Sequence, residues 1–183
     1  MPTTTTIDAG TYTTDPVHSS FQASARHMGV STFRTGFEDV EARLTSDATG
    51  MHLEGRAQVR SISITKPPEF REHVVNGEDF FDASKHPEIV FSSSRLDLAD
   101  DGTAELDGEL VIKGIARPLH ATGSWQEPTE DAFGGLRTAL DLTAVFDRRD
   151  YGLDWQMPLP KGGHALGWDV TVEVQLELTK DAG

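Results

Sequence analysis

Apolar and polar residues alternate along most of the chain, and a period of two is typical of β-strands with one buried face. The clearest run is DVTVEVQLEL, residues 169–178, where valine or leucine fills every second position. This run predicts a strand with one face in a core and the other in water. Further strands are predicted over residues 17–25, 51–59, 87–98, 104–114 and 136–146, with a hairpin turn at residues 100–102.

One segment, residues 66–87, interrupts the alternation. Phe70 and Val74 have the spacing of one helical face, and the prolines at 67–68 come just before them. The Asn-Gly pair at 76–77 is a signal that ends a helix. The pattern therefore predicts one short helical insertion in a chain of antiparallel strands.

The predicted buried faces carry many small residues. A β-sandwich core is filled by large interdigitating side chains, whereas a barrel of about eight strands can keep a cavity for one ligand. The small side chains favour the second arrangement, so we predict an all-β fold: a single antiparallel β-barrel of about eight strands with one short helical insertion. The small residues on these faces are Ser19, Ala23, Ala25, Gly55, Ala57 and Ala144.

The length of 183 residues suits one sizeable domain. Residues 1–9 are polar and threonine-rich, and we predict that they form a disordered lead before a single domain over residues 10–180. No repeat, linker or change in composition divides this range.

Charge and composition narrow the function. With 16 basic and 30 acidic residues the formal net charge is −14, so phosphate backbones repel the chain and nucleic acid is not an expected partner. The absence of cysteine excludes disulfides and zinc–thiolate sites. The N-terminus lacks the features of a signal peptide, and no apolar run is long enough for an integral membrane segment. We therefore expect a cytoplasmic protein.

The residues that could support catalysis or bind a metal are poorly placed for either. In the stretch DPVHSS a regular strand would point His18 and Ser19 to opposite faces, which argues against a hydrolase triad. The seven histidines show no metal-ligand spacing. A long-range site, for instance His27 with His73 or His164, is left as the less favoured alternative. We predict no catalytic residue and no metal.

The stretch FDRRDYGLDW, residues 146–155, contains charged residues that a continuing strand would point into the barrel. If the preceding strand continues regularly, Arg148 and Asp150 share the inward parity of Phe146. Arg148 could then pair with Asp150 or with Asp15 and close one end of the barrel. Alternatively, the chain leaves the sheet here and parity has no meaning. The sequence does not decide between these two interpretations.

Four stretches occur in the order seen in one known family. DPVHSSFQASARH, VRSISITKPPEFREHVVNGEDFFDASKHPEIVFSSSRL, LDGELVIKGIARPL and FDRRDYGLDW resemble the successive signatures of the YceI-like, polyisoprenoid-binding family. The resemblance covers residues 10–179. This sequence departs from the family pattern at Ala23 and Ala25, where larger residues are usual, and at Asp147, where asparagine is usual.

The resemblance implies an extended lipocalin-like barrel with a long apolar pocket for a polyisoprenoid, an isoprenoid quinone or a similar lipid. It implies neither catalysis nor a metal, and the only cofactor-like molecule that it suggests is the bound lipid. Because some members of the family dimerise, the resemblance also implies that this protein could form a homodimer.

The pattern and the resemblance together predict a non-enzymatic carrier or storage protein for a long apolar molecule. Two alternatives remain: an enzyme acting on a hydrophobic substrate with His27 as general base, and a stress-related structural protein with a filled barrel. Polar contacts to a ligand head group are predicted from His18, His27, Arg148 and Asp150. The predicted apolar lining is Phe21, Ala23, Ala25, Phe33, Phe37, Phe81, Phe91, Leu110, Ile112, Leu142, Phe146 and Trp168.

Overall fold

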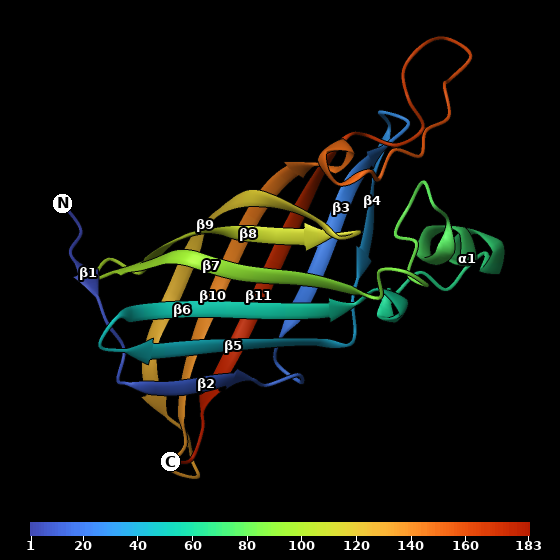
Figure 1. Cartoon of the computed structure of the whole chain (residues 1–183). Helices are drawn as coiled ribbons and strands as arrows, with labels where there is room; N and C mark the ends of the chain where they lie inside the picture. The colour runs from blue at the N-terminus through green and yellow to red at the C-terminus, as the bar shows by residue number, and fades with distance from the viewer.

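The computed structural model describes residues 1–183, and its strands form one antiparallel sheet that closes on itself. In Figure 1, β2 and β5 to β8 cross in front of β9, β10 and β11 at a steep angle, so the barrel has two facing layers. The eight strands of the ring are β2 (Gly10–Thr14), β5 (Val40–Asp47), β6 (Gly50–Gln58), β7 (Glu88–Ala99), β8 (Thr103–Ile112), β9 (Ile115–Glu130), β10 (Leu136–Asp147) and β11 (Asp169–Lys180).

The ring closes between β10 and β11, which pair from Arg137 to Asp147 of β10. β11 pairs on its other side with β2 at one end and with β3 (Ser20–His27) at the other. The N-terminal part of the chain therefore runs along β11 in two pieces. β3 forms a hairpin with β4 (Ser31–Gly36), which is a free edge beside the ring. The prediction of a single antiparallel barrel of about eight strands is confirmed.

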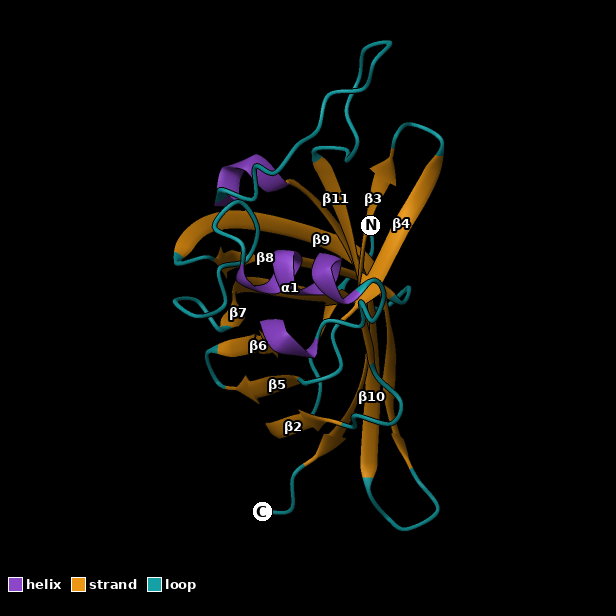
Figure 2. Cartoon of the chain, turned by 90° about the vertical axis from the view of Figure 1, so that its right-hand side faces the viewer, coloured by secondary structure: helices purple, strands orange, loops and turns teal.

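The predicted helical insertion is α1 (Pro68–Asn76), in the connection from β6 to β7 that also holds the short 3-10 turn η1 (Val59–Ser61). Proline suits the first helical position because it lacks a backbone N–H, and an N–H there would have no partner within the helix. The helix ends where the Gly77 N–H donates to the His73 carbonyl at 2.8 Å. Figure 2 shows α1 lying across one end of the barrel. Its buried face packs on Ile62, Ile64 and Phe80.

The far end of the barrel from α1 is filled by the protein's own side chains, and we call it the filled end. Its largest members are at most 2% exposed, and the indole Nε1–H of Trp125 donates to the Ala99 carbonyl at 2.8 Å. These large side chains leave no room for a ligand at this end. The filled end is formed by Tyr12, Leu44, Leu98, Leu140 and Leu178.

The first nine residues differ from the predicted disordered lead. Residues Thr4–Thr5 form β1, which pairs with Leu98 and Ala99 of β7. Ile7 is 6% exposed, and its carbonyl accepts a hydrogen bond from the Ser46 hydroxyl at 3.0 Å. This end of β7 extends past its pairing with β6 and offers free backbone groups to the lead.

Candidate ligand-binding cavity

A cavity of about 360 Å³ lies between the ring and the segment that contains α1. This volume falls within the range of small-molecule sites, roughly 300–1,000 Å³. Of the 41 residues that line the cavity, 33 are hydrophobic, and the cavity is partly open to solvent. Burying a charged group among such residues is costly, so the lining suits an apolar molecule.

One wall of the cavity is formed by β3. Phe21, Ala23, Ala25 and His27 all line it, because alternate residues of a strand point to the same side. Ala23 lies opposite Val172 of β11, and the two alanines leave space that larger residues would fill. His27 is exposed, so this wall extends from the barrel interior to the protein surface.

The facing walls come from β7, β8 and β10. Phe91 and Leu110 are paired across β7 and β8, and both line the cavity. A Cβ atom on Gly108 would come within 2.5 Å of the Phe91 ring, so this glycine makes room for the ring. Other predicted residues that line the cavity are Ile112, Leu142 and Phe146.

Aromatic rings cover the cavity on the α1 side. Phe33 of β4 meets Phe70 of α1 edge to face, with 6.1 Å between ring centroids, and Phe37 meets Phe81 in the same way at 6.2 Å. These contacts join the β3–β4 hairpin to the α1 segment. Several lining residues were not predicted as part of the lining, because they come from distant segments: Phe70, Val74, Phe80, Trp155 and Leu166.

Arg148 lines the cavity and is 2% exposed. No carboxylate lies within ion-pair distance. Its Nη1 instead donates to the carbonyls of Leu153 at 2.5 Å and Trp155 at 2.8 Å. Nη2 and Nε donate to the carbonyls of Leu166 at 3.1 Å and Gly167 at 2.9 Å. Burial lowers the pKa of Arg148. Its donors hold the 153–167 loop in place and are not free for a ligand head group.

The structure places two of the predicted site residues, Asp150 and Trp168, outside the cavity lining. Asp150 is exposed and makes no pair with Arg148. Trp168 does not line the cavity, and its ring centroid lies 4.3 Å from the guanidinium carbon of Arg148. Asp150 does not share the inward side of Phe146, because β10 ends at Asp147 and the 3-10 turn η2 (Arg148–Tyr151) follows. Strand parity therefore does not continue beyond β10.

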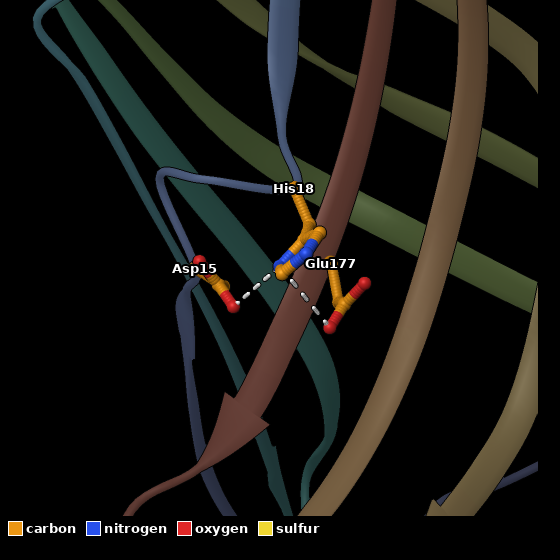
Figure 3. Close-up of side chains that lie close together, drawn as sticks. All are labelled: Asp15, His18 and Glu177. Atoms are coloured by element: carbon orange, nitrogen blue, oxygen red, sulfur yellow. Dashed lines mark hydrogen bonds and ion pairs between the residues drawn. The ribbon is translucent and has the colours of Figure 1, made fainter.

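His18 is also placed outside the cavity. The chain turns at residues 15–19 before β3 begins, and His18 Nδ1 lies 2.9 Å from Asp15 Oδ2 and 3.9 Å from Glu177 Oε1 on the outer surface of β11 (Figure 3). Asp15 pairs with Arg137 at 2.8 Å and not with Arg148. Hydrogen bonding to Asp15 raises the pKa of His18. These contacts fasten the turn between β2 and β3 to the ring.

Asp15, His18 and Glu177 could in principle hold a metal ion, because their ligand atoms lie within 4.8 Å of one another. The Arg137 guanidinium already donates to both carboxylates, at 2.8 Å in each case. This cation supplies the positive charge that two carboxylates require. The cluster therefore needs no metal to balance it.

We expect the stability of the protein to fall as the pH rises through the folded-state pKa of His18. That pKa is raised above its ordinary value of 6.5, so its stabilising contribution is complete below this value and is lost at higher pH. His18→Gln should lose less stability than the wild type between about pH 6 and pH 9 in thermal unfolding. His164→Gln, at an exposed histidine without a carboxylate partner, is the control. Identical pH profiles for wild type and His18→Gln would contradict this assignment.

Tyr151 carries a buried hydroxyl without a hydrogen-bond partner. The residue is 1% exposed, and burial raises its pKa to about 12. We expect Tyr151→Phe to raise the free energy of unfolding by about 1 kcal/mol in urea denaturation, because an unsatisfied buried group is costly. Tyr12→Phe is the control and should lose stability, since the Tyr12 hydroxyl donates to the Asp8 carbonyl at 3.1 Å. A loss of stability in Tyr151→Phe would refute the prediction.

The fold and the cavity define a class of protein: a closed antiparallel β-barrel with a cavity lined mainly by apolar side chains. The family model described as the YceI-like domain matches residues 12–178, so the chain belongs to the YceI-like family. No helix of the structure has both the length and the apolar character needed to cross a membrane.

Sequence relatives and solved structures agree with this membership. A UPF0312 protein of Shewanella sp. is 27% identical over 167 residues, covering 87% of this chain and 83% of the relative. A UPF0312 protein of Staphylococcus aureus is 25% identical over 173 residues, covering 92% and 96%. The fold matches BcnA of Burkholderia cenocepacia with a TM-score of 0.71 at 18% identity, covering 92% and 99%. It also matches a polyisoprenoid binding domain from Saccharophagus degradans with a TM-score of 0.66 at 10% identity, covering 93% and 98%.

Proposed function

We propose that this protein binds a long apolar amphiphile, a polyisoprenoid or an isoprenoid quinone, in the barrel cavity and acts as a carrier or storage protein. The observation that carries the proposal is the cavity itself, with 33 hydrophobic residues among the 41 that line it. Each CH₂ group buried there contributes about 0.8 kcal/mol. A long hydrocarbon chain therefore supplies enough driving force to offset the ordering cost of binding.

The polar end of such a ligand belongs near His27. This side chain lines the cavity yet is exposed to solvent, and its ring makes no hydrogen bond within the protein. Arg148 is less suited to that role because its donors are used by backbone carbonyls. The proposed arrangement places the apolar tail toward the filled end and the head group beside His27.

The first test is solvent extraction of the purified protein, with mass spectrometry of the extract and titration with a fluorescent polyprenyl analogue. We expect a long-chain isoprenoid lipid in the extract and saturable binding of the analogue. Recovery of no lipid together with no binding would refute the proposal. Conversion of the bound lipid by the wild type but not by His27→Ala would instead indicate an enzyme.

Filling the cavity is the sharper test of where the ligand binds. Ala144 is 6% exposed and lines the cavity, so Ala144→Phe should weaken binding of the analogue at least about tenfold, or about 1.4 kcal/mol. Ala116→Phe is the matched control, because Ala116 is exposed and lies outside the lining. Equal affinities in the two folded variants would place the ligand elsewhere.

A further inference from the structure

Two chain segments project together at the end of the molecule where His27 reaches the surface. One is the tip of the β3–β4 hairpin, and the other is the loop over residues 155–168, both at the top of Figure 2. The Met28 N–H donates to the Ala165 carbonyl at 2.8 Å, and the Ala165 N–H donates to the Met157 carbonyl at 2.9 Å. The two segments therefore form one continuous surface, which we call the tip.

The tip carries large apolar side chains that are exposed to solvent. Met28 is 45% exposed, Val30 is 80% exposed and Met157 is 57% exposed. Large apolar side chains gathered in one exposed place are characteristic of an interaction surface. None of the three lines the cavity, so the cavity does not explain them.

The charge of the tip is opposite to that of the whole protein. Neither residues 26–37 nor residues 155–168 contain an acidic residue, although the chain has 30 of them. These ranges hold Arg26, Arg34 and Lys161, none of which forms an ion pair. Asp154 and Asp169 stand just outside the loop, and Glu38 and Asp39 directly follow the hairpin range. Because salt screens charges beyond roughly 10 Å, the sign of the local charge decides what the tip attracts.

The tip also adjoins the proposed binding site. His27 and Phe33, at the base of the hairpin tip, line the cavity, and so do Ala165 and Leu166 in the loop. A surface in contact with the tip would therefore lie beside the open side of the cavity.

We propose that the tip docks on the surface of an anionic lipid bilayer, with its apolar side chains among the acyl chains and its cations near the head groups. This combination of exposed apolar residues and cations is how proteins bind at a membrane interface without spanning it. The inference rests on the proposed lipid-binding function, since docking would bring the cavity to the source of its ligand. The acidic remainder of the molecule then stays in water.

The opposite end of the barrel provides an internal control. Phe133, in the β9–β10 turn at the bottom of Figure 1, is 95% exposed. Its surroundings are acidic, with Glu127, Glu130 and Asp131 close in sequence. An exposed apolar side chain in this setting should be repelled by anionic head groups, so its loss should not change docking.

The test is co-flotation of the full chain with vesicles of phosphatidylglycerol and phosphatidylcholine in equal parts. We expect the wild type to float with these vesicles, more weakly with phosphatidylcholine alone and more weakly at high salt. Combined replacement Met28→Ser, Val30→Ser and Met157→Ser should lower the partition coefficient at least about tenfold. Arg34→Glu with Lys161→Glu should lower it on anionic vesicles only. Phe133→Ser should float like the wild type.

Absence of flotation by the wild type, or equal flotation of the combined serine variant and the wild type, would overturn the proposal. A wild-type dimer that the serine variant abolishes, without vesicle binding, would instead show a second copy on the tip and also overturn it. Titration with the fluorescent polyprenyl analogue, without vesicles, separates the two proposals. Binding of the analogue without flotation removes only the docking proposal, and flotation without binding removes only the carrier proposal.

Discussion

Replacing Arg148 with methionine is expected to lower the free energy of unfolding by about 3 kcal/mol or more. Methionine fills similar space but leaves the carbonyls of Leu153, Trp155, Leu166 and Gly167 without their donor. Buried acceptors that lose a charged donor are costly, and here one side chain serves all four. Urea denaturation followed by tryptophan fluorescence measures the loss.

Arg148→Lys is the companion variant, because it keeps the charge and loses the planar fork of donors. We expect it to recover only part of the stability, since one ammonium cannot reach carbonyls on both sides of the loop. Leu153, Trp155 and Leu166 line the cavity, so both variants should also bind the polyprenyl analogue more weakly. Wild-type stability in Arg148→Met would show that water satisfies these carbonyls and that the arginine is dispensable.

Gly123→Ala is expected to destabilise the barrel by about 3 kcal/mol, the upper range for overpacking. Gly123 of β9 lies opposite Leu142 of β10, and a Cβ atom there would overlap the carbonyl oxygen of Asp141. This obstacle is backbone within a ladder that forms part of the ring, so it cannot move aside as a flexible side chain would. The strands must separate or shift to admit a methyl group.

Gly55→Ala is the matched control on another strand of the same barrel. A Cβ atom at Gly55 would lie 3.6 Å from the Glu41 carbonyl oxygen and 3.9 Å from the Ala42 Cβ, which are ordinary contacts. Alanine also loses less chain entropy on folding than glycine. Thermal unfolding should therefore separate the two variants clearly. Equal melting temperatures would mean that β9 and β10 are packed less closely than the structure indicates.

Strands with clean alternation could be predicted from the sequence because one face points into the barrel over most of their length. The alternation was sufficient to predict β6, β7, β8, β10 and β11. β9 was not predicted, although it is the longest strand, because Pro118 and Pro128 and several polar residues interrupt its pattern. Proline removes a backbone donor, and its presence argues against a central strand. β4 and β5 were not predicted either.

The candidate site was predictable where it lies on a regular strand. Phe21, Ala23 and Ala25 line the cavity because the alternation of β3 holds from Ser20 onward. It was not predictable beyond β10, where Gly152 at φ +68° ends the turn η2 and reverses the chain. The aromatic cover depends on contacts between segments far apart in sequence, which a period of two does not reveal.

Because one end of the barrel is filled, the cavity is closed at that end and a ligand can enter only from the other side. Since Tyr12, Leu44, Leu98, Leu140 and Leu178 block one side, the cavity is a blind pocket and not a through-channel. A long amphiphile would have to enter tail first and leave head first. A molecule with polar groups at both ends would force one of them against the leucines, and a tail longer than the pocket would protrude past His27. The barrel would thus select its ligands by polarity along their length as well as by hydrophobicity.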